Sequence, residues 1–257
     1  MRRLIQAAAL LLVLTTILSF KTPEREFYEI RIYHLKNDAQ VSRLDAFLKD
    51  AYLPALHRAG LKNIGVFKPI DLDTADRRVY LLVPFKTLSD LVSVQDALSK
   101  DKQYLSSGAE YIDTKHDNPA FARIESIILQ AFSHNPKLQL PELKSARGER
   151  VYELRSYEGH SEKIFRNKVH MFNEGGEVAL FKRLGFNAVF YGEVLAGSRM
   201  PNLMYMTTFE NKASRDEHWK TFGADPEWKK LSSMPEYQNN VSKIDIFFLR
   251  PTEYSDY

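Results

Sequence analysis

The chain has 257 residues, and 44% hydrophobic with 12% aromatic residues is enough apolar material for sizeable folded cores. Its formal net charge of +3 falls to +1 when Arg2 and Arg3 are left out, so the charge gives no reason to expect nucleic-acid binding. The absence of cysteine excludes disulfides, thiolate nucleophiles and cysteine metal sites.

The first 20 residues have the pattern of an export signal. Arg2 and Arg3 precede an apolar stretch from Leu4 to Leu18, which is short for a bilayer span. We therefore expect residues 1–20 to be a signal peptide and the mature protein to be periplasmic or extracellular, with no membrane span. Because no A-x-A cleavage pattern precedes Lys21, an uncleaved signal that anchors the protein in the membrane is the alternative.

One segment of seven residues occurs twice. Phe27–Tyr33 (FYEIRIY) returns as Val151–Tyr157 (VYELRSY), with Tyr, Glu, Arg and Tyr in the same register. Later landmarks keep nearly the same spacing: Gly60 with Gly185, Phe85 with Phe209, Asp101 with Asp225, and Ile124 with Ile244. A repeat of this length is a whole domain rather than a solenoid unit. We expect a first domain at 21–133, a linker at 134–150 and a second domain at 151–257.

The first copy reads as strand, helix, two strands, helix, strand. The helix after the first strand begins at Asn37-Asp38, is interrupted at Pro54 and stops at Gly60. A further short helix is expected from Asp101. The expected strands span 27–33, 63–69, 79–85 and 122–132, with a polar turn at 71–78 and a helix at 88–98.

The second copy repeats this order. Its first helix begins near Ser161 and is interrupted at Gly175-Gly176, and Asp225-Pro226-Glu227-Trp228 opens a short capped helix. The expected strands span 151–157, 188–194, 203–209 and 243–249.

This element order is the ferredoxin-like β-α-β-β-α-β arrangement. Such a sheet carries helices on one face and needs a partner for the other. Because the chain supplies two copies, we expect an α+β protein in which two tandem ferredoxin-like domains face each other as a pseudo-dimeric α/β barrel. A higher oligomer stays open.

Alternation along the repeated strand separates two faces. We expect Tyr28, Ile30 and Ile32 to pack beneath the helices. The more polar face is then expected to line the shared lumen as a ligand-binding site: Glu29, Arg31, Tyr33, Glu153, Arg155 and Tyr157.

Three interpretations of these polar residues stay open. The Glu and Arg side chains could pair across the interface between the copies and fix its register. They could instead form a pocket in which Arg engages an anionic or carbonyl group beside Tyr. The strand could also lie at a rim, with its charges toward solvent.

Other chemistry has little support. Trp219, Phe222 and Trp228 have the spacing of core aromatics. The histidines lack metal-ligand spacing, so no metal site is expected, and we identify no lumen-facing histidine on a strand. We expect His57 and His170 to be structural or exposed. Phosphate-loop, dinucleotide and nucleophile-elbow motifs are absent from the sequence.

The paired Tyr-Glu-Leu/Ile-Arg-x-Tyr strands, the glycines Gly60 and Gly185, and the Asp225–Trp228 segment together resemble the NIPSNAP family of the dimeric α/β-barrel superfamily. The resemblance covers about residues 27–249 as two tandem domains. The first copy departs from it with Asp101-Lys102-Gln103-Tyr104 in place of Asp-Pro-Glu-Trp. The resemblance implies a fold and a ligand-holding barrel rather than a defined activity, and it leaves a cofactor, including haem, open.

Two main functional hypotheses follow. In the first, the exported protein binds a small organic ligand in the lumen through Arg31 and Arg155. In the second, it is a cofactor-independent monooxygenase- or isomerase-type enzyme with Glu29 or Glu153 as proton acceptor. A further alternative is a filled barrel that acts through its surface. The sequence identifies neither the ligand nor an established catalytic group.

Overall fold

The computed structural model describes residues 24–257, so the predicted signal at 1–20 lies outside the described part of the chain. The first half contains β1 (Phe27–Leu35), α1 (Asp38–Phe47), the π-helix η1 (Leu48–Tyr52), α2 (Leu53–Arg58), β2 (Gly65–Pro69), β3 (Arg77–Phe85), α3 (Leu88–Lys100), α4 (Lys102–Ser107), α5 (Ala109–Ile112) and β4 (Arg123–Ala131). The second half contains β5 (Val151–Glu158), α6 (Glu162–Asn173), α7 (Glu177–Arg183), β6 (Ala188–Ala196), β7 (Asn202–Phe209), α8 (Lys212–Ala224), α9 (Pro226–Ser233), the 3₁₀-helix η2 (Pro235–Tyr237) and β8 (Lys243–Pro251).

The strands form a closed barrel in the order β1-β3-β2-β8-β5-β7-β6-β4. Each half contributes a ferredoxin-like sheet, and antiparallel pairs β2–β8 and β4–β6 join the two sheets at their edges. Closure leaves neither sheet with a free edge. The predicted pseudo-dimeric α/β barrel is therefore confirmed.

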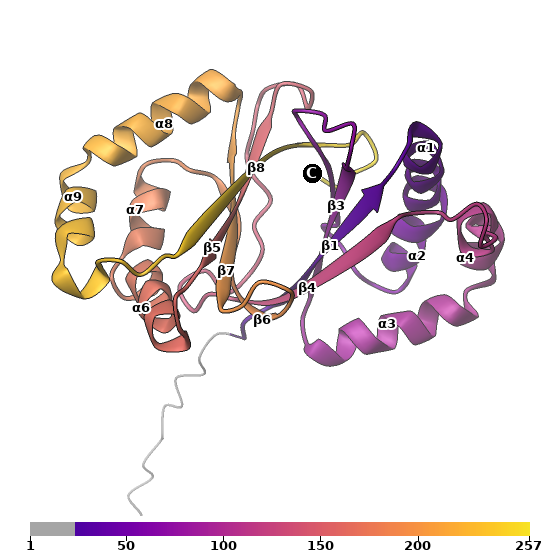
Figure 1. Ribbon diagram of the computed structural model, residues 1–257, viewed down its shortest axis with the longest axis horizontal. Helices are drawn as coiled ribbons and strands as arrows, with labels where there is room; N and C mark the ends of the chain where they lie inside the picture. The colour runs from indigo at the N-terminus through magenta and orange to yellow at the C-terminus, as the bar shows by residue number, and fades with distance from the viewer. Residues whose placement is uncertain (1–23) are drawn as a thin grey trace, which may run out of the picture.

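Helices flank this barrel on two sides. Figure 1 shows α1–α4 on one side of the strands and α6–α9 on the other. One apolar core lies inside the barrel. In each half, one further core lies between the sheet and its own helices. Most strands are consequently buried on both faces.

The predicted helix interruptions both occur, by different means. In the first half, the chain passes through the π-turn η1 immediately before α2, with Pro54 in the first turn of α2. The proline has no N–H for a regular helical bond, and a π-turn is one way of accommodating such a break. In the second half, α6 and α7 are separated at Gly176, whose φ of +91° is a left-handed value suited to glycine.

The two predicted short helices begin at their expected caps. Asp101 accepts a hydrogen bond from the Tyr104 backbone N–H at 2.9 Å, and Asp225 accepts one from the Glu227 N–H at 2.9 Å. Each cap satisfies a backbone donor that the helix leaves free. Within residues 24–257, no helix is both long enough and apolar enough to cross a bilayer.

Candidate functional site

The repeated strand faces the opposite way from the prediction. Tyr28, Ile30 and Ile32 belong to the core inside the barrel, whereas Tyr33 packs with the helices of the first half. The assignment of Glu29, Arg31 and Tyr33 to the lumen is therefore wrong. The error arises because both faces of β1 are buried, so apolar character does not distinguish the helix side from the lumen side.

In the second half, the predicted residues form a saturated network beneath α8. The Glu153 carboxylate is 0% exposed. It accepts hydrogen bonds from Arg155 at 2.8 Å, from Arg215 at 2.7 and 3.0 Å, and from the Trp219 indole N–H at 2.9 Å. The Arg155 guanidinium carbon lies 4.2 Å from the Trp219 ring centre. Glu153 is thus occupied by cationic and indole donors and does not reach the lumen.

The first half carries a looser version of the same network. Arg31 pairs with Glu29 at 3.0 Å and donates to the Tyr52 hydroxyl at 3.1 Å, while Ser126 donates to Glu29 at 2.7 Å. Burial raises the pKa of Tyr52 to about 12, even though the nearby Arg31 charge lowers it. Each repeated strand therefore pairs its own Glu with its own Arg, so the interpretation in which these side chains pair across the interface between the copies is wrong.

The tyrosines of the predicted site are also on the helix side. The Tyr157 hydroxyl lies 2.9 Å from that of Tyr205, and burial raises the pKa of both Tyr33 and Tyr157. The structure thus separates the six predicted residues into two networks, one under the helices of each half. That they bind a ligand stays a prediction, but they do not share one lumen.

The predicted core aromatics are confirmed in place. Phe222 is buried in the helix-side core of the second half, and Trp219 and Trp228 are partly buried against it. The ring centres of Phe222 and Trp228 lie 4.3 Å apart. These residues also position the Trp219 indole N–H that reaches Glu153.

One end of the barrel is filled by side chains. Tyr28 and Tyr152 lie near the starts of β1 and β5, and both are 0% exposed. The Tyr257 ring centre lies 5.4 Å from that of Phe67 and 6.1 Å from that of Tyr152. This end of the interior is therefore packed rather than hollow.

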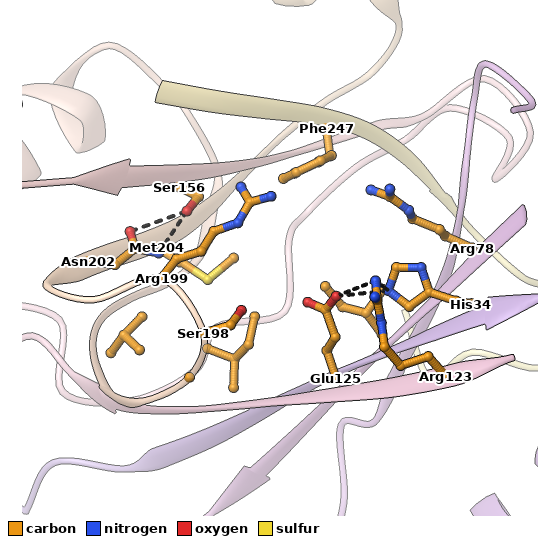
Figure 2. Close-up of a pocket in the computed structure, with 14 residues that line it drawn as sticks. His34, Arg78, Arg123, Glu125, Ser156, Ser198, Arg199, Asn202, Met204 and Phe247 are labelled. Atoms are coloured by element: carbon orange, nitrogen blue, oxygen red, sulfur yellow. Dashed lines mark hydrogen bonds and ion pairs between the residues drawn. The ribbon is translucent and has the colours of Figure 1, made fainter. Parts of the chain in front are cut away.

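The other end, where β1 and β5 finish, contains a cavity of about 110 Å³ that we call the mouth. Figure 2 shows its side chains converging from strands and loops of both halves. The first half contributes Ile32, His34, Arg78, Arg123, Glu125 and Ile127, and the second half contributes Ser156, Val194, Gly197, Ser198, Arg199, Asn202, Met204 and Phe247.

Charged groups at the first-half side of the mouth form a continuous chain. The Nε–H of Arg78 donates a hydrogen bond to the Asp76 carboxylate at 2.6 Å, and this carboxylate lies 2.8 Å from Nδ1 of His34. The other ring nitrogen of His34 lies 3.1 Å from Glu125, which accepts from Arg123 at 2.8 Å. Partial burial raises the pKa of Asp76, but the hydrogen bonds from His34 and Arg78 outweigh it and lower that pKa overall.

The second-half side of the mouth is chemically different. Strand register places Glu158 opposite Asn202 and Lys243, as it places His34 opposite Arg78 and Arg123 in the first half. Arg199, from the loop between β6 and β7, forms an ion pair with Asp245. The fold repeats, but the charges around the mouth do not.

His34 is a residue that the sequence interpretation missed. It lies on β1, its side chain is 7% exposed, and it lines the mouth. Extending the alternation of Tyr28, Ile30 and Ile32 by one step places His34 on their face of the strand, which is the lumen face in the structure. The reversed assignment of faces concealed this position.

Outside the mouth, the two histidines expected to be structural or exposed have polar partners. His57 lies 3.0 Å from Asp256, and His170 lies 2.9 Å from the Tyr237 hydroxyl. Among the residues described, no group of three or more His, Asp or Glu side chains has the geometry to hold a metal ion.

Fold and site define a fused, two-domain α/β barrel with one mouth cavity built by both halves. Residues 152–256 match the model of the NIPSNAP family. The second half of the chain is therefore similar to the NIPSNAP family, as the resemblance predicts, whereas the match does not extend to the first half, for which that resemblance stays a prediction.

Two solved structures that share the fold are distant in sequence. A proposed monooxygenase from Lactobacillus acidophilus NCFM is 10% identical with a TM-score of 0.58, covering 89% of this chain and 94% of its own. One from Fusobacterium nucleatum is 7% identical with a TM-score of 0.58, covering 89% and 93%. A NIPSNAP-like domain protein from Burkholderia xenovorans is 17% identical with a TM-score of 0.38, covering 42% and 89%. No curated protein matches this chain.

Proposed function

We propose that the protein binds a small organic molecule in the mouth of the barrel. The observation that carries this proposal is the cavity of about 110 Å³, whose wall combines apolar side chains with charged groups from both halves. Concave sites with an apolar lining and a few converging polar groups are the usual form of small-molecule sites. The rest of the interior is packed, so the mouth replaces the full lumen as the site.

The proposal differs from the filled-barrel alternative in one testable respect. Gly197 lines the mouth, and a Cβ added there would lie 3.4 Å from Ile127 and from Val194, which is ordinary contact. Gly197→Phe should therefore fill the cavity with little backbone strain, and Gly197→Ala is its matched control.

Native mass spectrometry of protein purified from its source organism tests this directly. We expect a small organic mass on the wild type and on Gly197→Ala, and its loss on Gly197→Phe. A bound mass that survives Gly197→Phe would place the ligand elsewhere. A wild type that binds no member of a mixed library of neutral, cationic and anionic molecules would favour a filled barrel that acts through its surface.

A second candidate function is a proton-transfer reaction on the bound molecule. His34 supports it, because its ring lines the cavity between two carboxylates, with Asp76 2.8 Å from Nδ1 and Glu125 3.1 Å from Nε2, so that a proton can move between the ring and Glu125 at the cavity wall. An imidazole oriented by a carboxylate is a common general base. Glu153 cannot take this role from its position beneath α8, and Glu29 lies on the helix side as well.

Deuterium uptake separates catalysis from binding. The molecule recovered from the mouth would be incubated with the protein in D₂O and examined by NMR. Catalysis predicts exchange at one carbon position that His34→Gln abolishes while binding persists. Equal exchange with and without protein would remove this candidate.

Export is proposed on the basis of Arg2, Arg3 and the apolar stretch that follows them. Edman sequencing of the protein recovered from the extracytoplasmic fraction tests it. A mature N-terminus near Lys21 is expected, whereas an intact Met1 in the membrane fraction would support the uncleaved anchor.

A further inference from the structure

Arginines dominate the charged lining of the mouth. Arg78, Arg123 and Arg199 line the cavity, and Glu125 is the acidic residue among the described residues of its wall. Figure 2 shows the guanidinium groups of Arg78 and Arg199 pointing into the cavity from opposite sides, beneath Phe247. Two guanidinium groups from different halves of the chain thus approach one space.

Carboxylates hold these two arginines from behind. Asp76 accepts from Nε of Arg78 at 2.6 Å, and Asp245 pairs with Nη1 of Arg199. Neither Asp76 nor Asp245 lines the cavity. Since a guanidinium has five N–H donors in a fixed fork, such anchoring orients the remaining donors without consuming them all.

The charged side chains around the mouth already form balanced pairs. Arg78, Arg123 and Arg199 are matched in number by their partners Asp76, Glu125 and Asp245. Because these pairs already balance, a ligand anion is held by the oriented N–H donors rather than by an excess of positive charge, and a second negative charge would add repulsion from Glu125. The arrangement therefore favours a monoanion.

The remainder of the wall is small and combines apolar side chains with the uncharged polar groups of Ser156, Ser198 and Asn202. Ile127, Met204 and Phe247 line it, and the Phe247 ring centre lies 5.8 Å from that of Tyr80 in the barrel core. A dry cavity of about 150 Å³ in another protein accommodates one benzene molecule. The mouth, at about 110 Å³ with an opening to solvent, therefore suits a body no larger than about one ring.

We propose that the ligand of the mouth is a small monocarboxylate with an apolar body of up to one ring. Its carboxylate lies between Arg78 and Arg199, where the guanidinium fork matches carboxylate geometry, and its body lies against Phe247 and Met204. This assignment rests on the mouth being the ligand site, as proposed above.

Isothermal titration calorimetry with three probes tests the assignment. Benzoate carries one negative charge on one ring, benzamide is its neutral counterpart, and phenylphosphonate carries up to two charges. The proteins are the wild type, Arg78→Gln, Arg199→Lys, and Arg166→Gln as a control on the exposed surface of α6. Arg199→Lys keeps the charge but loses the fork, so it separates geometry from net charge. Circular dichroism establishes that each variant is folded.

We expect benzoate to bind the wild type and Arg166→Gln with a Kd below about 1 mM, and benzamide and phenylphosphonate at least about tenfold more weakly. Arg78→Gln and Arg199→Lys should each weaken benzoate by about tenfold or more, as expected for a lost charge-assisted hydrogen bond. Benzamide that binds as tightly as benzoate, or unchanged benzoate affinity in both arginine variants, would overturn the assignment.

The same experiment distinguishes the two proposals. Neutral library molecules that bind the wild type but not Gly197→Phe, with no binding of benzoate, would overturn the monocarboxylate and leave the mouth as a site. Absence of binding by benzoate and by the whole library would overturn both.

Discussion

Replacement of Glu153 by alanine should destabilise the protein strongly, because this carboxylate is structural. The substitution removes a fully buried acceptor and four hydrogen bonds from Arg155, Arg215 and Trp219. Arg215 keeps Asp216 at 3.0 Å, but Arg155, with its side chain 10% exposed, loses its acidic partner. Removing one member of a buried ion pair costs about 3–5 kcal/mol, so we expect a loss of that size in the free energy of unfolding.

The equivalent residue in the first half provides a matched comparison. Glu29→Ala removes the shared acceptor of Arg31 and Ser126. The Arg31 side chain is 18% exposed and still donates to the Tyr52 hydroxyl. A loss of about 1–3 kcal/mol is expected, since less charge is left buried and unpaired.

Urea unfolding followed by circular dichroism measures both losses, and thermal melting should show a fall of about 6–20 °C for Glu153→Ala. Ligand binding at the mouth should not change in either variant that stays folded. A loss below about 1 kcal/mol for Glu153→Ala, or one no larger than that of Glu29→Ala, would refute the structural role assigned to this network.

Three further predictions concern backbone conformation and pH. Gly176→Ala should lower the free energy of unfolding by about 1–2 kcal/mol, because the backbone φ of +91° at this position is unfavourable for alanine. Gly223→Ala, inside α8, should instead stabilise the protein by about 0.4–1 kcal/mol. Equal effects of the two substitutions in urea unfolding would contradict this expectation. The folded pKa of Tyr52 is raised to about 12, so the contribution of neutral Tyr52 to the free energy of unfolding should be present below pH about 10 and be lost as the pH rises toward 12. If the free energy of unfolding falls with alkaline pH in Tyr52→Phe as it does in the wild type, this expectation is wrong. The folded pKa of Asp76 is lowered from 3.8, so the contribution of the ionised carboxylate to the free energy of unfolding should be present above that pH and be lost below it. In Asp76→Asn the free energy of unfolding should therefore fall less steeply at acid pH, and an unchanged fall would contradict the expectation.

The fold could be predicted because its signals are local and occur twice. The repeated strand, the Asp101 and Asp225 caps, and the breaks at Pro54 and Gly176 depend on neighbouring residues and on elementary backbone constraints. The bounds of the strands differ by only a few residues from those expected, as with β3, which begins at Arg77 rather than at residue 79.

The site could not be predicted in the same way, because it depends on contacts distant in sequence. The Glu153 charge is matched by Arg215 and Trp219 from α8, so a polar ladder that looks like a binding face is satisfied under a helix. Alternation identifies two faces but does not say which of two buried cores each one meets.

The mouth residues were missed for a related reason. The sequence predicts Arg78 in a polar turn, whereas β3 begins at Arg77 and projects Arg78 into the mouth. Arg199 lies in the loop between β6 and β7, where no periodic pattern indicates its direction. His34 alone carried a usable signal, as the next inward position after Ile32.

The most direct test of the account is a crystal structure of the protein with 4-bromobenzoate, whose bromine is located by anomalous scattering. We predict a bromine peak in the mouth beneath Phe247, with the carboxylate density between Arg78 and Arg199. A peak beneath α8 beside Arg155, with the mouth holding only solvent, would contradict the account and return the ligand site to the repeated Glu-Arg-Tyr strands.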